Sequence, residues 1–361
     1  MQIDDIIVVL RLEFADHFAG ALFNSMNSGN VRVAIDDASK LLFGQVVDFH
    51  PAVHLHFEIA HHRSGKNDVA DGTKPNNKDL CQEKNGIFSN VTDFRHLQPN
   101  EFTMQFFDTH AHMYAEAFAE DRIACMERAF AEGVKMVALP NIDSGSMVPM
   151  RDLCTRFPEN TIGMMGLHPG SVKENFEEEL GIIKKELDKG GFYAVGEIGL
   201  DLYWDKTFFP QQLEAFITQI NWAKEKKLPI AIHVREAFTE LFKIMDEHCD
   251  DRLSGVFHCF TGNGDDMKKA LAYPNFYLGI GGVVTFKNGG LDKILPDADI
   301  TRLVLETDAP YLAPVPFRGK RNETGYIKLI AEKLAIIKGM TVAEIADQTT
   351  TNARKLFKLN E

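Results

Sequence analysis

Cysteine is scarce in this chain and never occurs as a close pair. The 361 residues contain five cysteines, an odd number, and no CxxC motif. A protein held together by disulfides needs paired cysteines at much higher density, so a disulfide framework is not expected. The pattern favours the reducing environment of the cytoplasm.

Long apolar stretches are missing as well. No apolar run approaches the ~20 residues of a membrane-spanning helix. The amino-terminal run MQIDDIIVVLRLEF is interrupted by charged residues, and it lacks the charged start and long apolar centre of a secretory signal. The sequence therefore predicts a cytoplasmic protein without membrane association, and nothing in it points to an obligate protein partner.

The chain has fewer basic than acidic residues. Lys and Arg number 39 against 52 Asp and Glu, which gives a formal net charge of −13. An acidic surface repels a polyanion, so broad electrostatic docking on duplex DNA is not expected. An enzyme that takes one phosphodiester or one strand end into a metal site remains compatible with this charge, because bound cations supply positive charge locally.

The pattern of the chain changes near residue 104. Three short apolar runs before it are candidate strands: residues 4–23, 39–49 and 54–60. The first of these is equally a candidate helix. Segment 61–90 is polar and rich in turn formers, which predicts loop or disorder. His54 and His56 resemble a metal-binding motif, but no partner carboxylate or cysteine follows at the spacing of a metal site. We interpret residues 1–103 as an N-terminal extension, partly disordered or not native. The alternative is a small regulatory or partner-binding domain.

Residues 104–361 have the length and pattern of a barrel, since they are close to the ~250 residues typical of a (β/α)₈ fold. Eight runs are predicted to be strands: 105–112, 135–140, 161–168, 192–200, 229–234, 255–260, 276–282 and 302–308. Helical patterns lie between most of them, as at 119–134 and 209–227. Alternating strands and helices predict parallel strands, and the fold class is therefore α/β, a (β/α)₈ TIM-type barrel. An open doubly wound sheet is the alternative, but it would not bring the first and last strands together.

Histidines and carboxylates gather at the predicted carboxyl ends of these strands. They are His110, His112, Glu197, His233, His258 and Asp308. Imidazole and carboxylate ligands suit divalent ions such as zinc or manganese. Alternate residues of a strand share a face, so Asp108, His110 and His112 are expected to point into the barrel together. Glu197 is suited to bridge two ions, and Asp308 to bind one ion or to deprotonate the attacking water.

Further residues near the same strand ends are candidates for substrate contact. They are His168, Asp201, Arg235, Arg318 and Arg321. His168 is equally suited to cap the turn before Pro169, and Asp201 to orient a ligand histidine. The basic loop at 317–323 suits phosphate, which barrels often bind near strands 7 and 8, although a solvated loop is the alternative.

Seven motifs of this region together resemble the TatD family of metal-dependent hydrolases. In chain order they are DTHAH, GLHPG, VGEIGLD, IHVRE, FHCFTG, LETDAPYL and FRGKRNE. The resemblance implies a (β/α)₈ barrel with two divalent ions and deoxyribonuclease activity, often 3′→5′ exonucleolytic. It implies one ion at His110, His112, Glu197 and Asp308, and a second at Glu197, His233 and His258. It does not cover residues 1–103, and family members commonly begin at a position like Met104.

Residues and resemblance together predict a two-metal hydrolase that cleaves phosphodiester bonds of DNA, single-stranded or at 3′ ends. Glu197 and Asp308 are its catalytic candidates, and zinc, manganese or magnesium its cation. The alternative is an ester or amide hydrolase of the amidohydrolase kind, including removal of D-amino acids from tRNA. Several amidohydrolases bridge their ions with a carboxylated lysine, whereas this chain has Glu197 at that position. A non-catalytic metal protein that recruits a partner through residues 1–103 is a third interpretation, and the intact ligand set argues against it.

Overall fold

The computed structural model describes residues 7–14, 31–32, 53–60 and 104–359, and the chain divides into two units, Met1–Phe94 and Arg95–Glu361. Three strands of the first unit form an antiparallel sheet in the order β2-β1-β3; they are β1 (Ile7–Phe14), β2 (Val31–Arg32) and β3 (Val53–Ala60). Within the run 4–23, for which helix and strand were both open, Ile7–Phe14 form a strand, and the strand expected at 54–60 is confirmed. The side chains of His54 and His56, the candidate strand at 39–49 and the polar segment 61–90 lie outside the described residues.

Eight parallel strands make up the centre of the second unit within residues 104–359. They are β4 (Phe106–Asp108), β5 (Val134–Pro140), β6 (Thr161–Met164), β7 (Val195–Asp201), β8 (Ile230–Arg235), β9 (Gly255–Phe257), β10 (Phe276–Ile280) and β11 (Leu303–Leu305). Ladders join β4-β5-β6 and β7-β8-β9-β10-β11. A parallel bridge between Met164 and Ala194 joins the two sets on one side. On the other side Thr109 N donates to Leu305 O at 3.0 Å. The sheet is therefore closed, and the predicted (β/α)₈ barrel is confirmed.

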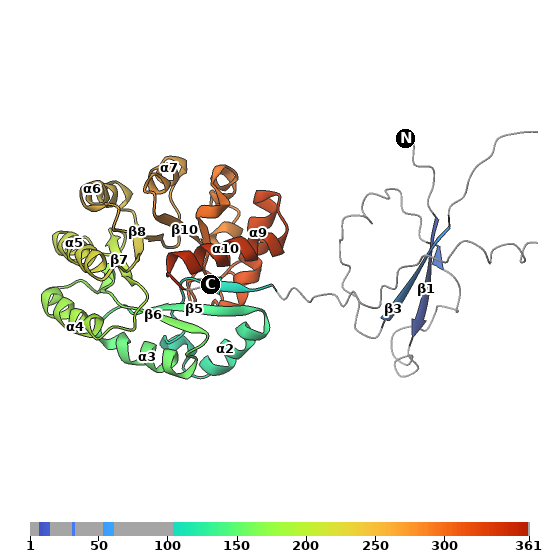
Figure 1. Ribbon diagram of the computed structural model, residues 1–361, viewed down its shortest axis with the longest axis horizontal. Helices are drawn as coiled ribbons and strands as arrows, with labels where there is room; N and C mark the ends of the chain where they lie inside the picture. The colour runs from blue at the N-terminus through green and yellow to red at the C-terminus, as the bar shows by residue number, and fades with distance from the viewer. Residues whose placement is uncertain (1–6, 15–30, 33–52, 61–103, 360–361) are drawn as a thin grey trace, which may run out of the picture. The chain divides into compact units, whose positions relative to one another are not determined.

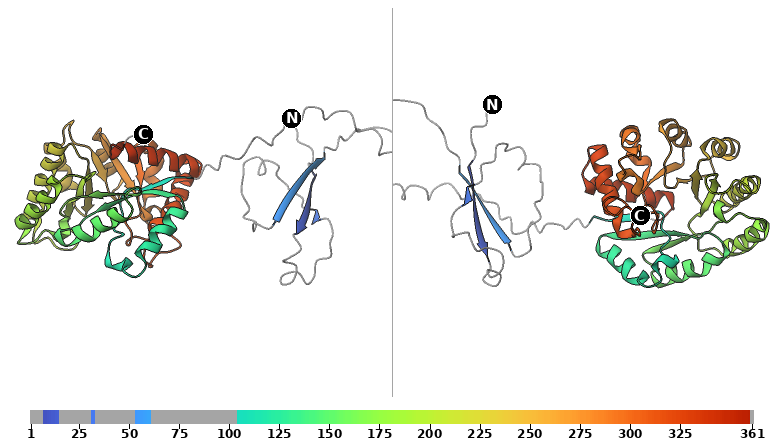
Figure 2. Two further views of the ribbon diagram at one scale, coloured as in Figure 1. Left: turned by 60° about the horizontal axis from the view of Figure 1, so that its bottom comes forward. Right: turned by 180° about the vertical axis from the view of Figure 1, so that it is seen from behind.

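Helices surround the strands on the outside (Figures 1 and 2). They are α2 (Arg122–Ala131), α3 (Met147–Arg156), α4 (Phe176–Asp188), α5 (Phe209–Lys226), α6 (Phe238–His248), α7 (Gly264–Ala272), α8 (Leu291–Ile294), α9 (Ile327–Lys338) and α10 (Val342–Leu356). The helices expected at 119–134 and 209–227 are α2 and α5. In α5, Phe216, Ile220 and Ala223 are fully buried at helical spacing. Burying one such phenylalanine contributes about 2–3 kcal/mol, so this face holds α5 against the strands. In the described part of the chain, no helix combines the length and apolarity that crossing a bilayer requires.

Helix α10 covers the amino-terminal end of the barrel (Figure 1). Its last turn places Leu356 and Phe357 against Phe107, and the two phenylalanine rings stack with centroids 5.4 Å apart. Asn352 Nδ2 also donates to Leu303 O, the first residue of β11, at 2.7 Å. Apolar side chains thus fill this end of the barrel. The opposite end, where the strands reach their carboxyl termini, is left for polar side chains.

A chain that begins at Met104 is expected to fold and to keep full activity, because the barrel core and its closing contacts lie within residues 104–359. Solubility, thermal unfolding and hydrolysis rate of the shortened and full chains provide the comparison. Loss of solubility or of most activity on shortening would show that residues 1–103 belong to the working protein.

Candidate active site

Histidines and carboxylates meet at the mouth of the barrel, defined here as the carboxyl end of its strands. Glu197 lies within β7 and His233 within β8, and the others follow β4, β6, β9 and β11: His110, His112, His168, His258 and Asp308. Parallel strands direct their carboxyl ends to one side, so residues distant in sequence converge there. His168 and His233 keep partial exposure, whereas the other five side chains are buried.

Each carboxylate oxygen of Glu197 lies close to two histidine nitrogens. Its Oε2 lies 3.2 Å from His110 Nε2 and 3.4 Å from His112 Nε2. Its Oε1 lies 2.8 Å from His233 Nδ1 and 3.4 Å from His258 Nε2. Ligand atoms that share a cation at 2.0–2.2 Å lie roughly 3–3.6 Å from one another. The two carboxylate oxygens therefore face different nitrogens, at spacings close to those that a bound divalent ion requires.

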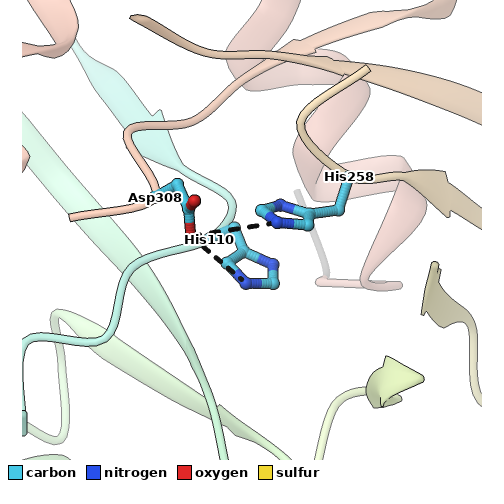
Figure 3. Close-up of side chains that lie close together, drawn as sticks. All are labelled: His110, His258 and Asp308. Atoms are coloured by element: carbon cyan, nitrogen blue, oxygen red, sulfur yellow. Dashed lines mark ion pairs between the residues drawn. The ribbon is translucent and has the colours of Figure 1, made fainter. Parts of the chain in front are cut away.

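Asp308 approaches the same histidines from the end of β11. Its Oδ1 lies 3.5 Å from His112 Nε2, 3.8 Å from His258 Nε2 and 4.0 Å from His110 Nε2. Figure 3 shows Asp308 with His110 and His258. The rings of His110 and His258 stack with centroids 3.5 Å apart. Asp308 N donates to His110 O at 2.8 Å, and the φ of Asp308 is 57°, in the left-handed region that Asp tolerates better than most residues. The contact that closes the barrel thus also positions Asp308 beside His110.

Strand β4 is shorter than the sequence predicted. We expected a strand at 105–112 with Asp108, His110 and His112 on one face, but β4 ends at Asp108. Asp108 is buried beneath the site, where it accepts from Thr307 N at 2.9 Å, and burial raises its pKa to about 7. It also accepts from His110 N at 3.3 Å, a local hydrogen bond that competes with the extended strand. His110 and His112 thus come from the segment after the strand, and strand alternation does not explain their shared direction.

A hydroxyl group determines which ring nitrogen of His112 faces Glu197. His112 Nδ1 lies 3.0 Å from the hydroxyl of Tyr114, and that hydroxyl donates its proton to Pro140 O at 2.6 Å. The hydroxyl must then accept from Nδ1. The tautomer with its proton on Nδ1 leaves the Nε2 lone pair directed at the carboxylates and free for a cation.

A carboxylate lies beside the outer nitrogen of both His258 and His233, and the one beside His233 is hydrogen-bonded to it. His258 Nδ1 lies 3.0 Å from Glu306 Oε1, and His233 Nε2 donates to Asp201 Oδ2 at 3.0 Å. The opposite nitrogens, His258 Nε2 and His233 Nδ1, face Glu197, and each can bind a cation once the cation displaces its proton. Gly279 makes room for Glu306, because a Cβ at that position would overlap the carboxylate.

His168 turns a protonated nitrogen toward the site. By distance alone it groups with Glu197 and His233, since its Nε2 lies 3.3 Å from Glu197 Oε1. Gly170 N, however, donates to His168 Nδ1 at 2.9 Å, so a neutral His168 carries its proton on Nε2. Burial lowers the pKa of His168, which favours this neutral form. The side chain therefore offers a hydrogen-bond donor to the site, whereas His112, His233 and His258 turn toward Glu197 the nitrogen that a cation would bind.

The charges of the site fit a divalent cation. Burial lowers the pKa of His258, but the charges of Glu306 and Glu197 raise it, to about 9. Burial raises the pKa of Glu197, but the neighbouring histidines lower it to well below its usual range. The carboxylates are thus ionised at neutral pH, and protonated imidazole provides their counter-charge. A cation takes the place of such protons when it binds, so donor types, spacing and charge all fit metal ions.

Asp201 and Arg235 end neighbouring strands and pair in register across β7 and β8. Asp201 is hydrogen-bonded to His233. This contact agrees with the interpretation that Asp201 orients a ligand histidine. The Arg235 guanidinium lies 3.8 Å from the centroid of the Tyr203 ring. Both residues therefore lie at the mouth, next to a candidate metal ligand.

The basic loop after β11 makes contacts of its own. The Arg318 guanidinium lies 3.9 Å from the centroid of the Phe286 ring. Arg321 forms ion pairs with Asp121 at 2.6 Å and with Glu323 at 2.8 Å. Two carboxylates already balance the charge of Arg321, which weakens it as a candidate for phosphate binding relative to Arg235 and Arg318.

The sequence did not predict Tyr114 and Glu306 as site residues, although Tyr114 is hydrogen-bonded to His112 and Glu306 lies beside His258. Tyr114 follows His112 by two residues, and Glu306 precedes Asp308 by two. That proximity was the available signal, because residues beside a ligand often orient another one. The tyrosine hydroxyl and the glutamate carboxylate reach their histidines through folded segments, which the sequence pattern does not reveal.

Asp201→Asn is expected to lower metal affinity or hydrolysis ~10–100-fold, because the amide holds the Nε2–H tautomer of His233 less strongly than the carboxylate does. Competition titration with zinc and the rate on one preparation measure both quantities. Asp205→Asn, an exposed carboxylate in the same segment, is the matched control and should leave both at the parental level. Equal behaviour of the two variants would remove Asp201 from the site.

The part of the chain that is similar to known proteins coincides with the barrel. The family model described as TatD related DNase matches residues 107–358. YabD of Bacillus subtilis, described as an uncharacterized metal-dependent hydrolase, is 40% identical over 255 residues, 70% of this chain and 99% of its own length. The 3′-5′ ssDNA/RNA exonuclease TatD of Erwinia tasmaniensis is 30% identical over 259 residues, 70% of this chain and 100% of its own. The crystal structure of YjjV, a TatD homologue from Escherichia coli K12, matches with a TM-score of 0.67 and 26% identity, over 72% of this chain and 100% of that one.

Proposed function

Because the chain belongs to the TatD-related DNase family, a family of metal-dependent hydrolases, we propose that it hydrolyses phosphodiester bonds from the 3′ end of single-stranded DNA. A relative named as a 3′-5′ ssDNA/RNA exonuclease supports the substrate class and direction. The observation that carries the proposal is the position of Glu197, whose two oxygens face separate histidines at ligand spacing.

Two cations are assigned to the two sides of Glu197. His110, His112 and Asp308 would hold the first together with Glu197. His233 and His258 would hold the second, also together with Glu197. When bound, a pair of divalent ions lowers the pKa of water and neutralises the charge that develops on the attacking and leaving oxygens.

Asp308 is assigned the proton of the attacking water. Burial raises its pKa, but the hydrogen bond to His112 and the positive charge of His258 and His110 lower it below its usual range. The carboxylate is therefore ionised at neutral pH and able to accept a proton. His168 is assigned to the substrate, because an Nε2–H that faces the site can donate to a phosphate oxygen and hold the phosphodiester in place.

Metal analysis followed by a degradation assay tests this function. The purified full chain should retain zinc, manganese or magnesium, and should shorten 5′-labelled single-stranded DNA stepwise from its 3′ end. A chelator should stop the reaction, and adding back the cation should restore it. If the metal-loaded protein leaves DNA intact but hydrolyses D-aminoacyl-tRNA or an amide, the amidohydrolase alternative replaces the proposal.

A further inference from the structure

Two large aromatic side chains are exposed beside the candidate metal centre. Trp204 is 76% exposed and Tyr203 is 47% exposed. They follow β7, the strand that carries Glu197, and their rings meet edge to face with centroids 4.8 Å apart. Adjacent exposed aromatic rings at a site often mark a binding surface, because leaving them in water forgoes the gain from burial.

The segment that carries these rings is fixed to the site. Asp201 Oδ1 accepts from Tyr203 N at 2.9 Å and from Trp204 N at 3.4 Å. The other oxygen of the same carboxylate accepts from His233 Nε2. A single side chain thus holds both the aromatic pair and a candidate metal ligand, so the rings keep a set position relative to the bond to be cut.

Arg235 braces the aromatic pair. Its guanidinium lies 3.8 Å from the centroid of the Tyr203 ring and 5.2 Å from that of Trp204. It follows His233 by two residues on β8. A guanidinium stacked on a ring keeps its edge donors for phosphate. The surface of Tyr203, Trp204 and Arg235, called the aromatic platform below, therefore combines stacking faces with one positive charge.

We propose that the aromatic platform stacks an unpaired base of a single-stranded nucleic acid next to the phosphodiester that is cleaved. This inference rests on the proposed function and names how its substrate is held. The chain has a net charge of −13, so general attraction to phosphates is weak and contacts with bases must carry more of the affinity. A base within a duplex already stacks on its neighbours, which gives the platform a preference for single strands.

The two tryptophans of the chain allow a direct test. With Trp222→Phe in the full chain, Trp204 is the remaining tryptophan, and its fluorescence reports on the platform. We expect an oligothymidylate with phosphorothioate linkages, which slow cleavage, to quench this fluorescence. An abasic strand of the same length and linkage should bind about tenfold or more weakly. An oligouridylate distinguishes a platform open to RNA from one restricted to DNA. Equal quenching by the abasic strand, or no quenching by thymidylate, overturns the proposal whether or not the protein cleaves DNA.

Variants separate the platform from the chemistry. For the parent we expect faster cleavage of oligothymidylate than of an abasic phosphodiester strand, and for Trp204→Ala a ratio of the two rates that falls about tenfold toward one. Tyr193→Ala is the matched control, since this tyrosine is 39% exposed and precedes β7 at the other end of the barrel; its ratio should equal that of the parent. An unchanged ratio in Trp204→Ala rejects the platform while leaving the nuclease intact. Absence of cleavage of either strand by the parent instead rejects the proposed function.

Discussion

Glu197→Gln is expected to lose at least one cation per chain and to hydrolyse DNA at least ~10²-fold more slowly, since positioned metal ions supply several kcal/mol of transition-state stabilisation. The substitution keeps the shape of the side chain but removes the negative charge that two cations would share. The amide also presents one N–H₂ donor where the carboxylate presents a second acceptor, and that donor faces imidazole nitrogens 2.8–3.4 Å away. Metal content by elemental analysis and single-turnover cleavage on one preparation measure the outcome.

The control for this variant is Glu186→Gln. Glu186 is also buried, but it lies on α4, where it pairs with Lys189 at 2.6 Å and with Arg151. It should keep the parental metal content and rate even if it lowers the melting temperature. Full metal content and a near-parental rate in Glu197→Gln would end the bridging role of Glu197.

Asp308→Asn is expected to reduce kcat strongly while changing DNA affinity less and retaining part of the metal. An amide oxygen still ligates a cation, but an amide is a poor base at neutral pH. The backbone should tolerate the change, because asparagine accepts the left-handed conformation that Asp308 adopts at φ 57°. A fall in rate therefore reports on the side chain and not on local refolding.

Asp308→Ala complements this variant by removing the ligand oxygen as well. We expect it to lose more metal than Asp308→Asn and to hydrolyse DNA more slowly still. Measurements of metal content, DNA binding and single-turnover cleavage separate the roles. Parental cleavage by Asp308→Asn would mean that Asp308 is neither base nor essential ligand. Loss of all metal in that variant would make its role structural.

Strand positions in the barrel were predictable because buried parallel strands are apolar on both faces. β5 was expected at 135–140 and lies at Val134–Pro140. The residues at which the strands end, at the mouth of the barrel, were harder to predict. β6 was expected to reach residue 168 but ends at Met164. Beyond it Gly166 N donates to the Asn141 side chain at 2.7 Å and Leu167 N to that of Gln219 at 2.6 Å. Amide side chains from distant elements thus replace the strand ladder, and apolar periodicity carries no trace of them.

The gathering of His110, Glu197, His233 and Asp308 was predictable from residue type and strand order, because a closed barrel directs all its strand ends to one mouth. Which nitrogen of each histidine carries a proton was not predictable from the sequence. Whether a histidine offers a lone pair or a proton depends on one hydrogen bond at its other nitrogen. For His168 that bond comes from Gly170 N, so its side chain caps the turn that begins at Pro169, as one of its two sequence interpretations expected.

The hydrogen bonds that close the barrel join residues 196 positions apart, Thr109 and Leu305. His110 and Asp308 lie directly beside this seam, so they meet only after the final strand has been made and has docked on the first. Contacts of such long sequence separation form late, because the entropy of closing the chain must be overcome first. A chain that has not yet formed β11 therefore lacks Asp308 beside His110. A change that opens this seam is accordingly expected to separate the candidate ligands even where the individual strands persist.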